Sequence, residues 1–110
     1  MHYLSETYSA KPAWLALSQA ERSHLLETIL AGMAHLGDSG ITVLAMGQAD
    51  PSDDTAPEFF ALWELRDRGS QALLLSAIAA TGWHDYFQTT IVAGPAVSVE
   101  AHLHQLQTVA

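Results

Sequence analysis

The residues best suited to chemistry in this sequence lie close together in the stretch 81–87, where an apolar helical pattern ends and the last strand pattern begins. Within this stretch His84 stands beside Asp85. Imidazole titrates near neutral pH, so His84 could act as a general base with Asp85 as the carboxylate that tunes it. Neighbouring residues of a strand point to opposite sides, so the two act together only if the turn bends them toward each other. We therefore take His84 as the candidate catalytic residue, with a capping or surface histidine as the alternative.

Aromatic side chains are the candidates for the wall of a ligand pocket. They come from the first strand, a short helical step, the third strand and the 81–87 turn: Tyr3, Trp14, Trp63, Trp83 and Tyr86. Such side chains combine a large apolar surface with a polar tip, which suits a pocket for a small molecule. The alternative for each is a place in the core. Trp14 could be a lid over the pocket, or it could fasten its helical step to the sheet.

One further spacing suggests metal binding, because His102 and His104 are separated by a single residue. Two such histidines lie on one side of a strand and can chelate a metal there, but on a helix they diverge by about 200°. The tail favours a helix, since Val99, Leu103 and Leu106 share one helical face. We therefore predict no metal site.

Two glutamates on neighbouring predicted strands, Glu6 and Glu64, could form a carboxylate pair for acid and base catalysis. Alternation along the third strand, however, places Glu64 on the side of Phe60 and Leu62. A role for Glu64 in positioning Arg66 or a partner subunit is the plainer interpretation.

Composition narrows the class of protein. The chain has 110 residues, 49% of them hydrophobic, which predicts a single folded domain spanning residues 1–110. Its formal net charge of -8 would repel a nucleic-acid backbone. It contains no cysteine, which excludes disulfides and thiolate sites. The longest apolar run, residues 72–80, is far shorter than the roughly 20 residues that span a bilayer. We expect a cytoplasmic protein without a membrane or nucleic-acid partner and without a cofactor.

Residue alternation predicts four strands, over 2–8, 41–49, 58–66 and 86–93. An acidic, turn-rich loop at 50–55 separates the second strand from the third.

Two helices are expected between these strands. Ser18 opens a Ser-x-x-Glu capping box, which should begin a long helix that ends at Gly37. A second helix should begin at Asp67 or Ser70. It should end before Gly82, whose freedom to adopt a positive φ suits the turn that follows.

The resulting order β-α-β-β-α-β predicts an α+β, ferredoxin-like sandwich with a four-stranded antiparallel sheet and a C-terminal helical tail. Right-handed crossovers place the first and third strands in the centre and both helices on one face. The other face would then expose apolar side chains, namely Leu44, Met46, Phe60 and Leu62. A second copy of the sheet is the natural cover, so we expect a homodimer.

Three stretches carry a family resemblance: the helical step 11–15, the strand 59–63 and the turn 82–87. With the order of elements, they resemble the dimeric α+β barrel superfamily, and in particular a functionally unassigned branch related to antibiotic biosynthesis monooxygenase-like proteins. The resemblance covers nearly the whole chain. It implies a ligand site between sheet and helices, and activities such as cofactor-independent oxygenation, cyclisation, lactone isomerisation or haem degradation. The sequence has no asparagine, so the Asn, Trp and Tyr set of the quinone-forming monooxygenases has no counterpart.

Two functions of different class remain open at this point. In the first, the chain binds or transforms a small apolar or aromatic molecule, with His84 or Tyr3 as a polar contact beside the tryptophans. In the second, it is a non-catalytic dimeric module for regulation or assembly, and its aromatic residues only fill the core. A cavity with convergent polar groups would favour the first, and a filled interior the second.

Overall fold

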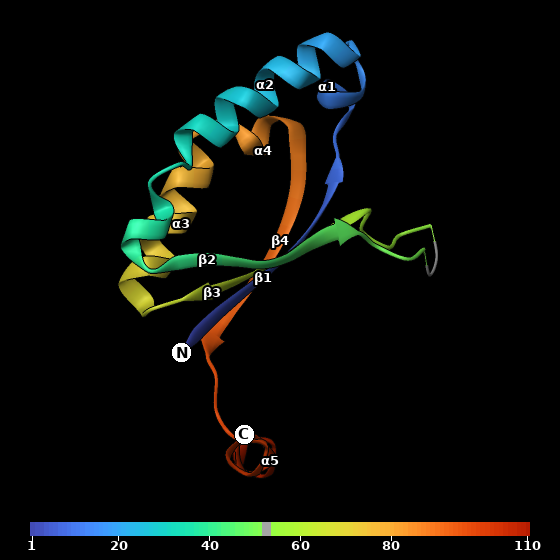
Figure 1. Cartoon of the computed structure of the whole chain (residues 1–110). Helices are drawn as coiled ribbons and strands as arrows, with labels where there is room; N and C mark the ends of the chain where they lie inside the picture. Colours follow the sequence, from blue (N-terminus) through green and yellow to red (C-terminus); the bar gives the residue numbers. More distant parts are fainter. Residues whose placement is uncertain (52–53) are drawn as a thin grey trace.

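The computed structural model describes residues 1–51 and 54–110 and has the predicted α+β, ferredoxin-like architecture (Figure 1). Four antiparallel strands form one sheet in the order β2-β3-β1-β4, with β1 and β3 in the centre. The strands are β1 (His2–Ala10), β2 (Ile41–Gln48), β3 (Phe59–Leu65) and β4 (Phe87–Pro95). Part of the predicted 50–55 loop, Ser52 and Asp53, lies outside the described residues. No helix in the described ranges is long and apolar enough to cross a membrane.

The chain between β1 and β2 forms a short helix and a long one. They are α1 (Pro12–Leu15) and α2 (Gln19–Gly32). The predicted capping box is confirmed, because the Ser18 side chain accepts from the Glu21 backbone and the Glu21 carboxylate accepts from the Ser18 backbone. The expected helix end at Gly37 was wrong, because α2 ends five residues earlier.

A 3₁₀ turn, η1 (Leu36–Ser39), carries the chain from α2 into β2. The left-handed residue that closes this turn is Gly40, with φ 75°. A Cβ atom on Gly40 would lie 2.7 Å from the Cβ of Arg66, so the turn needs glycine for space as well as for conformation.

The second crossover contains α3 (Arg68–Ala80) and a single helical turn, α4 (Trp83–Tyr86). Asp67 caps α3 by accepting from the Ser70 backbone. Gly82 has φ 83°, as its place in the sequence predicted, and begins α4. The stretch that we expected to run directly into the last strand therefore makes one helical turn first.

The sheet has two distinct faces, and a β-bulge in β2 decides which side chains reach each one. On the face toward the helices, the inner face, β1 and β3 bury Leu4, Trp63 and Leu65. The register between β2 and β3 shifts at Leu44, so that Val43 pairs with Trp63 and the next pairs are Ala45 with Leu62 and Met46 with Ala61.

The bulge places Met46 on the inner face, although the sequence predicted it on the outer face. An extra residue in one strand reverses the alternation beyond it. Leu44, Leu62 and Val92 do lie exposed away from the helices, on the outer face, and line a shallow groove there.

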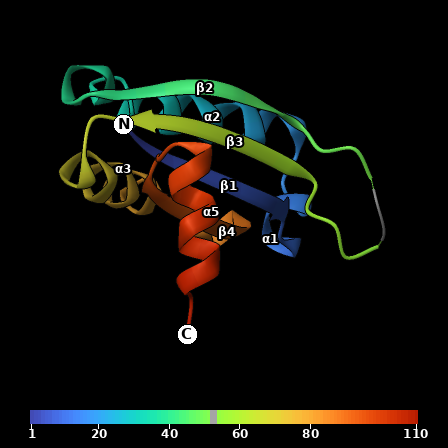
Figure 2. The same ribbon diagram turned by 90° about the horizontal axis from the view of Figure 1, so that it is seen from below.

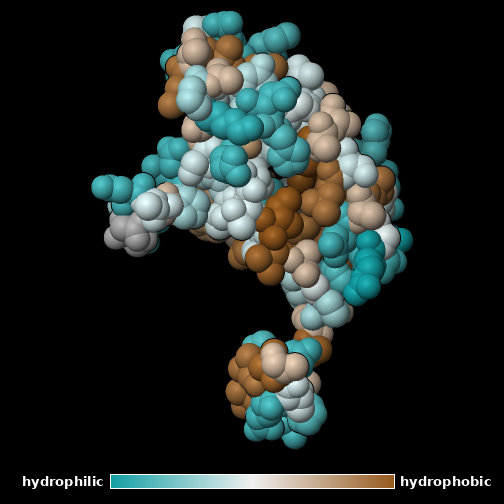
Figure 3. Space-filling model, turned by 180° about the vertical axis from the view of Figure 1, so that it is seen from behind, coloured by the Kyte–Doolittle hydropathy of each residue, from teal (hydrophilic) through white to brown (hydrophobic). Residues whose placement is uncertain are grey.

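The last element, α5 (Val99–Thr108), is the predicted helical tail. Ser98 caps it by accepting from the Ala101 backbone. Figures 1 and 2 place α5 on the side of the outer face, away from the other helices. None of its residues is buried. Its apolar side, with Val99, Leu103 and Leu106, is exposed, as the separate helix in Figure 3 shows.

An apolar cavity with one buried carboxyl group as the candidate functional site

A cavity of about 590 Å³ lies between α2 and the inner face of the sheet. Its floor comes from β1, β2 and β3, and its roof from α2 and the turn that follows. Most of its wall is aliphatic, including Leu26, Ile29, Leu30, Met33, Met46 and Ile78. Aromatic side chains close one part of it, and Glu6 is the only charged residue among the described residues that line it.

The cavity exists because α2 does not pack closely against the sheet. The apolar residues of this helix recur at the spacing typical of a helix face packed on the core, yet only Ile29 within α2 is buried. Leu26 and Leu30 remain exposed, Leu30 to 71%, although both line the cavity. These apolar side chains therefore form one wall of an open space.

Glu6 is held by the central strand β1, between Ala61 of β3 and Ile91 of β4. It is only 4% exposed. Its Oε1 accepts a hydrogen bond of 3.1 Å from the Trp63 indole nitrogen. Its Oε2 is buried and has no hydrogen-bond partner among residues 1–51 and 54–110. A carboxyl oxygen in that position costs free energy unless a proton or a ligand satisfies it.

Burial raises the pKa of the Glu6 carboxyl above its ordinary value, because the charged form loses solvation. The Trp63 hydrogen bond and the nearby charge of His84 oppose this effect by stabilising the carboxylate, but burial is the larger influence on the pKa. Such a group exchanges a proton closer to neutral pH than an exposed glutamate does, which is a common property of binding and catalytic sites.

Tyr8 lies two residues further along β1 and lines the same cavity. Burial and the neighbouring Glu6 charge raise the pKa of its phenol, so the hydroxyl keeps its proton and can donate. Its ring meets Trp83 edge to face, with centroids 5.0 Å apart. Trp83 in turn stacks on Phe87 at 4.1 Å, and its indole nitrogen donates to Thr89. These contacts hold the aromatic end of the cavity in place.

The predicted site residues divide between this cavity and other places. Trp63 and Trp83 line it. Trp14 is buried instead against Phe87, at 4.8 Å between ring centroids, and against Tyr86 at 5.7 Å. Arg22 lies over the Trp14 ring and donates to its carbonyl. Trp14 thus fastens α1 to the start of β4, the structural alternative considered above, and it does not form a lid.

Two predicted polar contacts lie away from the cavity. His84 is exposed on α4 and does not line it, although its charge acts on the Glu6 carboxyl. The His84 backbone carbonyl accepts from the Lys11 ammonium group. Tyr3 lies on the outer face, where its hydroxyl donates to Glu64 at 3.2 Å. The sheet therefore separates Tyr3 from Trp63 and Trp83.

Glu6 and Glu64 likewise lie on opposite faces, so they do not form a carboxylate pair. Glu6 pairs with Ala61 across the strands, whereas Tyr3 pairs with Glu64. The sequence did contain a signal for Glu6: alternation along β1 placed it between Leu4 and Tyr8 on one side. A charged residue at an inward position of a central strand needs a specific reason. Glu6 is thus a site residue that the sequence pattern indicated and that we did not predict.

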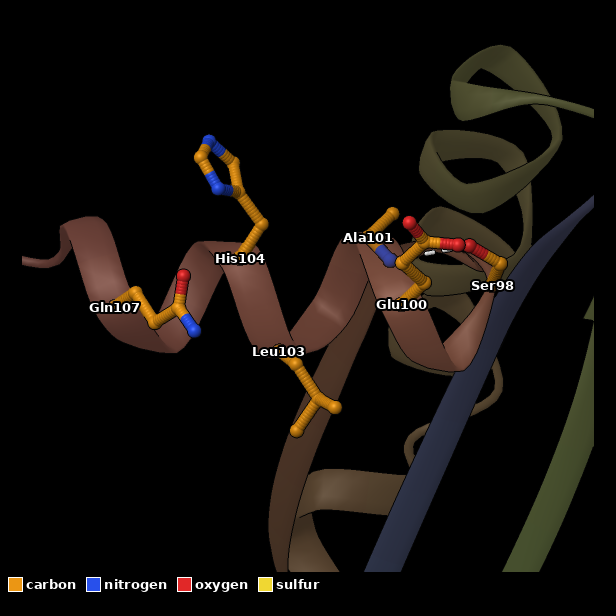
Figure 4. Close-up of a pocket in the computed structure, with 6 residues that line it drawn as sticks. All are labelled: Ser98, Glu100, Ala101, Leu103, His104 and Gln107. Atoms are coloured by element: carbon orange, nitrogen blue, oxygen red, sulfur yellow. Dashed lines mark hydrogen bonds between the residues drawn. The ribbon is translucent and has the colours of Figure 1, made fainter.

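A second hollow, on α5, has no convergent chemistry. Figure 4 shows its side chains projecting from one helix, with His104 and Leu103 pointing in different directions. His102 contacts Gln105 of the same helix. Among residues 1–51 and 54–110, no cluster of three acidic or histidine side chains could hold a metal.

Comparison with protein families identifies the chain over almost its whole length. Residues 1–109 match the model of a family described as "Family of unknown function (DUF6616)". The chain belongs to this family. No curated protein sequence matches it.

Solved structures with the same fold include three of different origin. A chlorite dismutase variant from Candidatus Nitrospira defluvii has a TM-score of 0.72 at 15% identity, covering 94% of this chain and 44% of that one. HapK from Hahella chejuensis has a TM-score of 0.59 at 13% identity, covering 89% and 94%. At3g17210 from Arabidopsis thaliana has a TM-score of 0.59 at 12% identity, covering 90% and 98%. The chain thus spans less than half of the chlorite dismutase chain, and these likenesses establish the ferredoxin-like fold alone.

Haem, which some dimeric α+β barrel enzymes degrade, does not fit the lining of this cavity. The cavity's described lining contains no histidine to bind the iron and no lysine or arginine to pair with the propionates. The propionates would also meet the Glu6 carboxyl.

Proposed function

We propose that the chain binds a small, largely apolar or aromatic molecule in the cavity between α2 and the sheet. The observation that carries this proposal is the unpartnered Oε2 atom of Glu6, buried at the edge of an otherwise apolar space. Ligand pockets commonly combine an apolar wall with a few polar groups that orient the ligand. A core residue with no role would be expected to have its polar atoms satisfied.

An enzymatic role is the finer form of the same proposal. The resemblance to antibiotic biosynthesis monooxygenase-like proteins suggests oxygenation, cyclisation or isomerisation without a cofactor. Glu6 supports this version, because a carboxyl group with a raised pKa can take up and return a proton. Glu6 and Tyr8 replace His84 as the groups that we expect to contact the ligand.

Binding can be tested with Nile red, a neutral dye whose fluorescence increases in apolar surroundings. Ala31 and Ala34 are both exposed, but Ala34 lines the cavity and Ala31 does not. We expect Ala34→Phe to fill the cavity and abolish saturable dye binding, and Ala31→Phe to leave it unchanged. Equal binding by wild type and both variants would place the dye elsewhere and count against the cavity.

The second candidate function, a dimeric module without catalysis, is favoured by the surface opposite the cavity. Leu44, Leu62 and Val92 form an exposed apolar patch on the outer face, and α5 presents another exposed apolar side nearby. We propose that a second copy of the chain covers this surface as a homodimer. Dimerisation is compatible with ligand binding, because the cavity lies on the inner face of the sheet.

A further inference from the structure

The charges around the cavity restrict the kind of molecule that can enter it. Glu6 is the only charged residue in the described lining, which contains no lysine, arginine or histidine. The chain as a whole carries a formal charge of -8. A carboxylate or phosphate ester would therefore meet like charge without a compensating partner, which costs heavily in an apolar space.

The polar groups that line the cavity favour a ligand with a hydrogen-bond donor. Oε1 of Glu6 already accepts from Trp63, so Oε2 is the carboxyl oxygen that lacks a partner. Rotation about the last torsion of a glutamate side chain is soft, so a small adjustment can bring Oε2 to the cavity surface. An ammonium group would bring three donors to this single unpartnered oxygen, whereas a hydroxyl brings one.

We propose that the ligand is a neutral aromatic alcohol of the phenol type, whose hydroxyl donates to Oε2 of Glu6 and accepts from the hydroxyl of Tyr8. This inference rests on the proposed function. Both side chains point from β1 to the inner face and line the same cavity. The Tyr8 and Trp83 rings, held edge to face, provide an aromatic wall beside them. The flat body of the ligand then contacts this wall and the aliphatic roof formed by α2.

Four probes that share one ring system separate the possible ligand classes: 2-naphthol, 2-methoxynaphthalene, 2-naphthoate and 2-naphthylmethylamine. Their dissociation constants can be measured at pH 7 by calorimetry. A hydrogen bond from the ligand hydroxyl to Oε2 of Glu6 predicts that 2-naphthol binds about tenfold more tightly than 2-methoxynaphthalene. We expect 2-naphthoate to bind most weakly.

Variants test whether Glu6 causes the preference for 2-naphthol over 2-methoxynaphthalene. In Glu6→Gln an NH₂ group replaces the accepting oxygen. The dissociation constants of 2-naphthol and its methyl ether should then agree to within about threefold. Tyr8→Phe should weaken 2-naphthol more than 2-naphthylmethylamine, which has no acceptor for the tyrosine hydroxyl at neutral pH. Glu64→Gln, on the opposite face of the sheet, makes the same charge change and should leave the preference for 2-naphthol unchanged.

The outcomes distinguish this inference from the proposed function. Equal binding of 2-naphthol and its methyl ether would overturn the phenol assignment and leave an apolar binding site standing. Tightest binding by the amine would assign a cationic ligand instead. Binding by none of the four would remove the proposed function together with this inference. If Glu6→Gln does not fold, the ranking of the four probes on the wild-type chain still decides between the ligand classes.

Discussion

The buried carboxyl group of Glu6 is unfavourable for folding, and for that reason it marks the candidate ligand site. On the central strand β1, Glu6 lies opposite Ala61 and Ile91. Its carboxyl group accepts one hydrogen bond there, from the Trp63 indole. Protein interiors rarely retain such a group without a functional reason, because an apolar residue of similar size would stabilise the fold more.

The raised pKa of Glu6 predicts a specific dependence of stability on pH. When the folded state raises the pKa of a carboxyl group, folding favours its protonated form. That stabilisation is complete below the pKa of the unfolded chain and is lost as pH rises through the folded-state pKa. We therefore expect Glu6→Gln to be more stable than wild type at pH 7, with an advantage that shrinks toward pH 4.

Urea unfolding of both chains at several pH values measures this difference. Glu64→Gln removes a carboxylate from the outer face and controls for the change in net charge. An advantage of Glu6→Gln that stayed constant from pH 4 to pH 7 would show that the Glu6 carboxyl is not destabilised by burial.

Trp83 and His84 are adjacent, yet we expect their substitutions to act differently. Trp83 stacks on Phe87, contacts Tyr8 and donates to Thr89, so Trp83→Ala should cost about 3 kcal/mol of unfolding free energy. His84 is exposed, so His84→Ala should change stability by no more than about 0.5 kcal/mol. Thermal and urea unfolding test both values. Strong destabilisation by His84→Ala would reveal a structural role that its exposure does not suggest.

At the scale of elements, two local irregularities set the geometry of the cavity. The bulge at Leu44 turns Met46 toward the inner face, where it becomes part of the cavity wall. The early end of α2 leaves room for η1, which directs the chain into β2 through Gly40.

The two glycines of this turn provide a matched pair of substitutions. Gly40 has a positive φ and would bring a Cβ against Arg66, whereas a Cβ on Gly37 meets nothing within 4 Å. We expect Gly40→Ala to cost at least about 1–2 kcal/mol and Gly37→Ala to be close to neutral. Chemical denaturation measures both. A larger effect at Gly37 would support the helix end that its position in the sequence suggested.

At the scale of the whole molecule, two apolar surfaces lie uncovered on the outer side of the sheet. No layer from the described part of the chain covers the shallow groove lined by Tyr3, Leu44, Leu62 and Val92. Helix α5, of ten residues, has no buried side chain. An isolated helix of this length is marginal in water, so packing against another surface would stabilise it.

Substitution of Leu62 tests the proposed homodimer. A charged side chain at the centre of an apolar interface costs roughly several kcal/mol, so Leu62→Glu should shift the chain toward the monomer. Sedimentation or light scattering at micromolar concentration would detect this change. Leu73→Glu, at an exposed position of α3, is the control. A wild-type chain that is monomeric at this concentration would rule out the proposed dimer.

The sequence by itself determined the four strands, the two crossover helices that connect them and the order of strands in the sheet. The capping box at Ser18, the turn glycine at Gly82 and the alternation along β1 and β3 act over a few residues, so local patterns were enough to predict them. Topology followed because right-handed crossovers allow few arrangements of β-α-β-β-α-β.

Only the tertiary structure decided where the cavity lies and which groups line it. Leu26 and Leu30 have the spacing of core residues, but whether a helix packs closely depends on the volumes of side chains from distant elements. Trp14 and Phe87, seventy-odd positions apart in the chain, meet only when β1 and β4 pair, and the bulge that turns Met46 inward has no signature in the alternation of β2. Alternation along β1 groups Glu6 with Leu4 and Tyr8, yet its unpartnered oxygen became evident only from the position of Trp63. The physical reason is that burial and hydrogen-bond satisfaction depend on contacts between distant residues, whereas periodicity reports only the local chain.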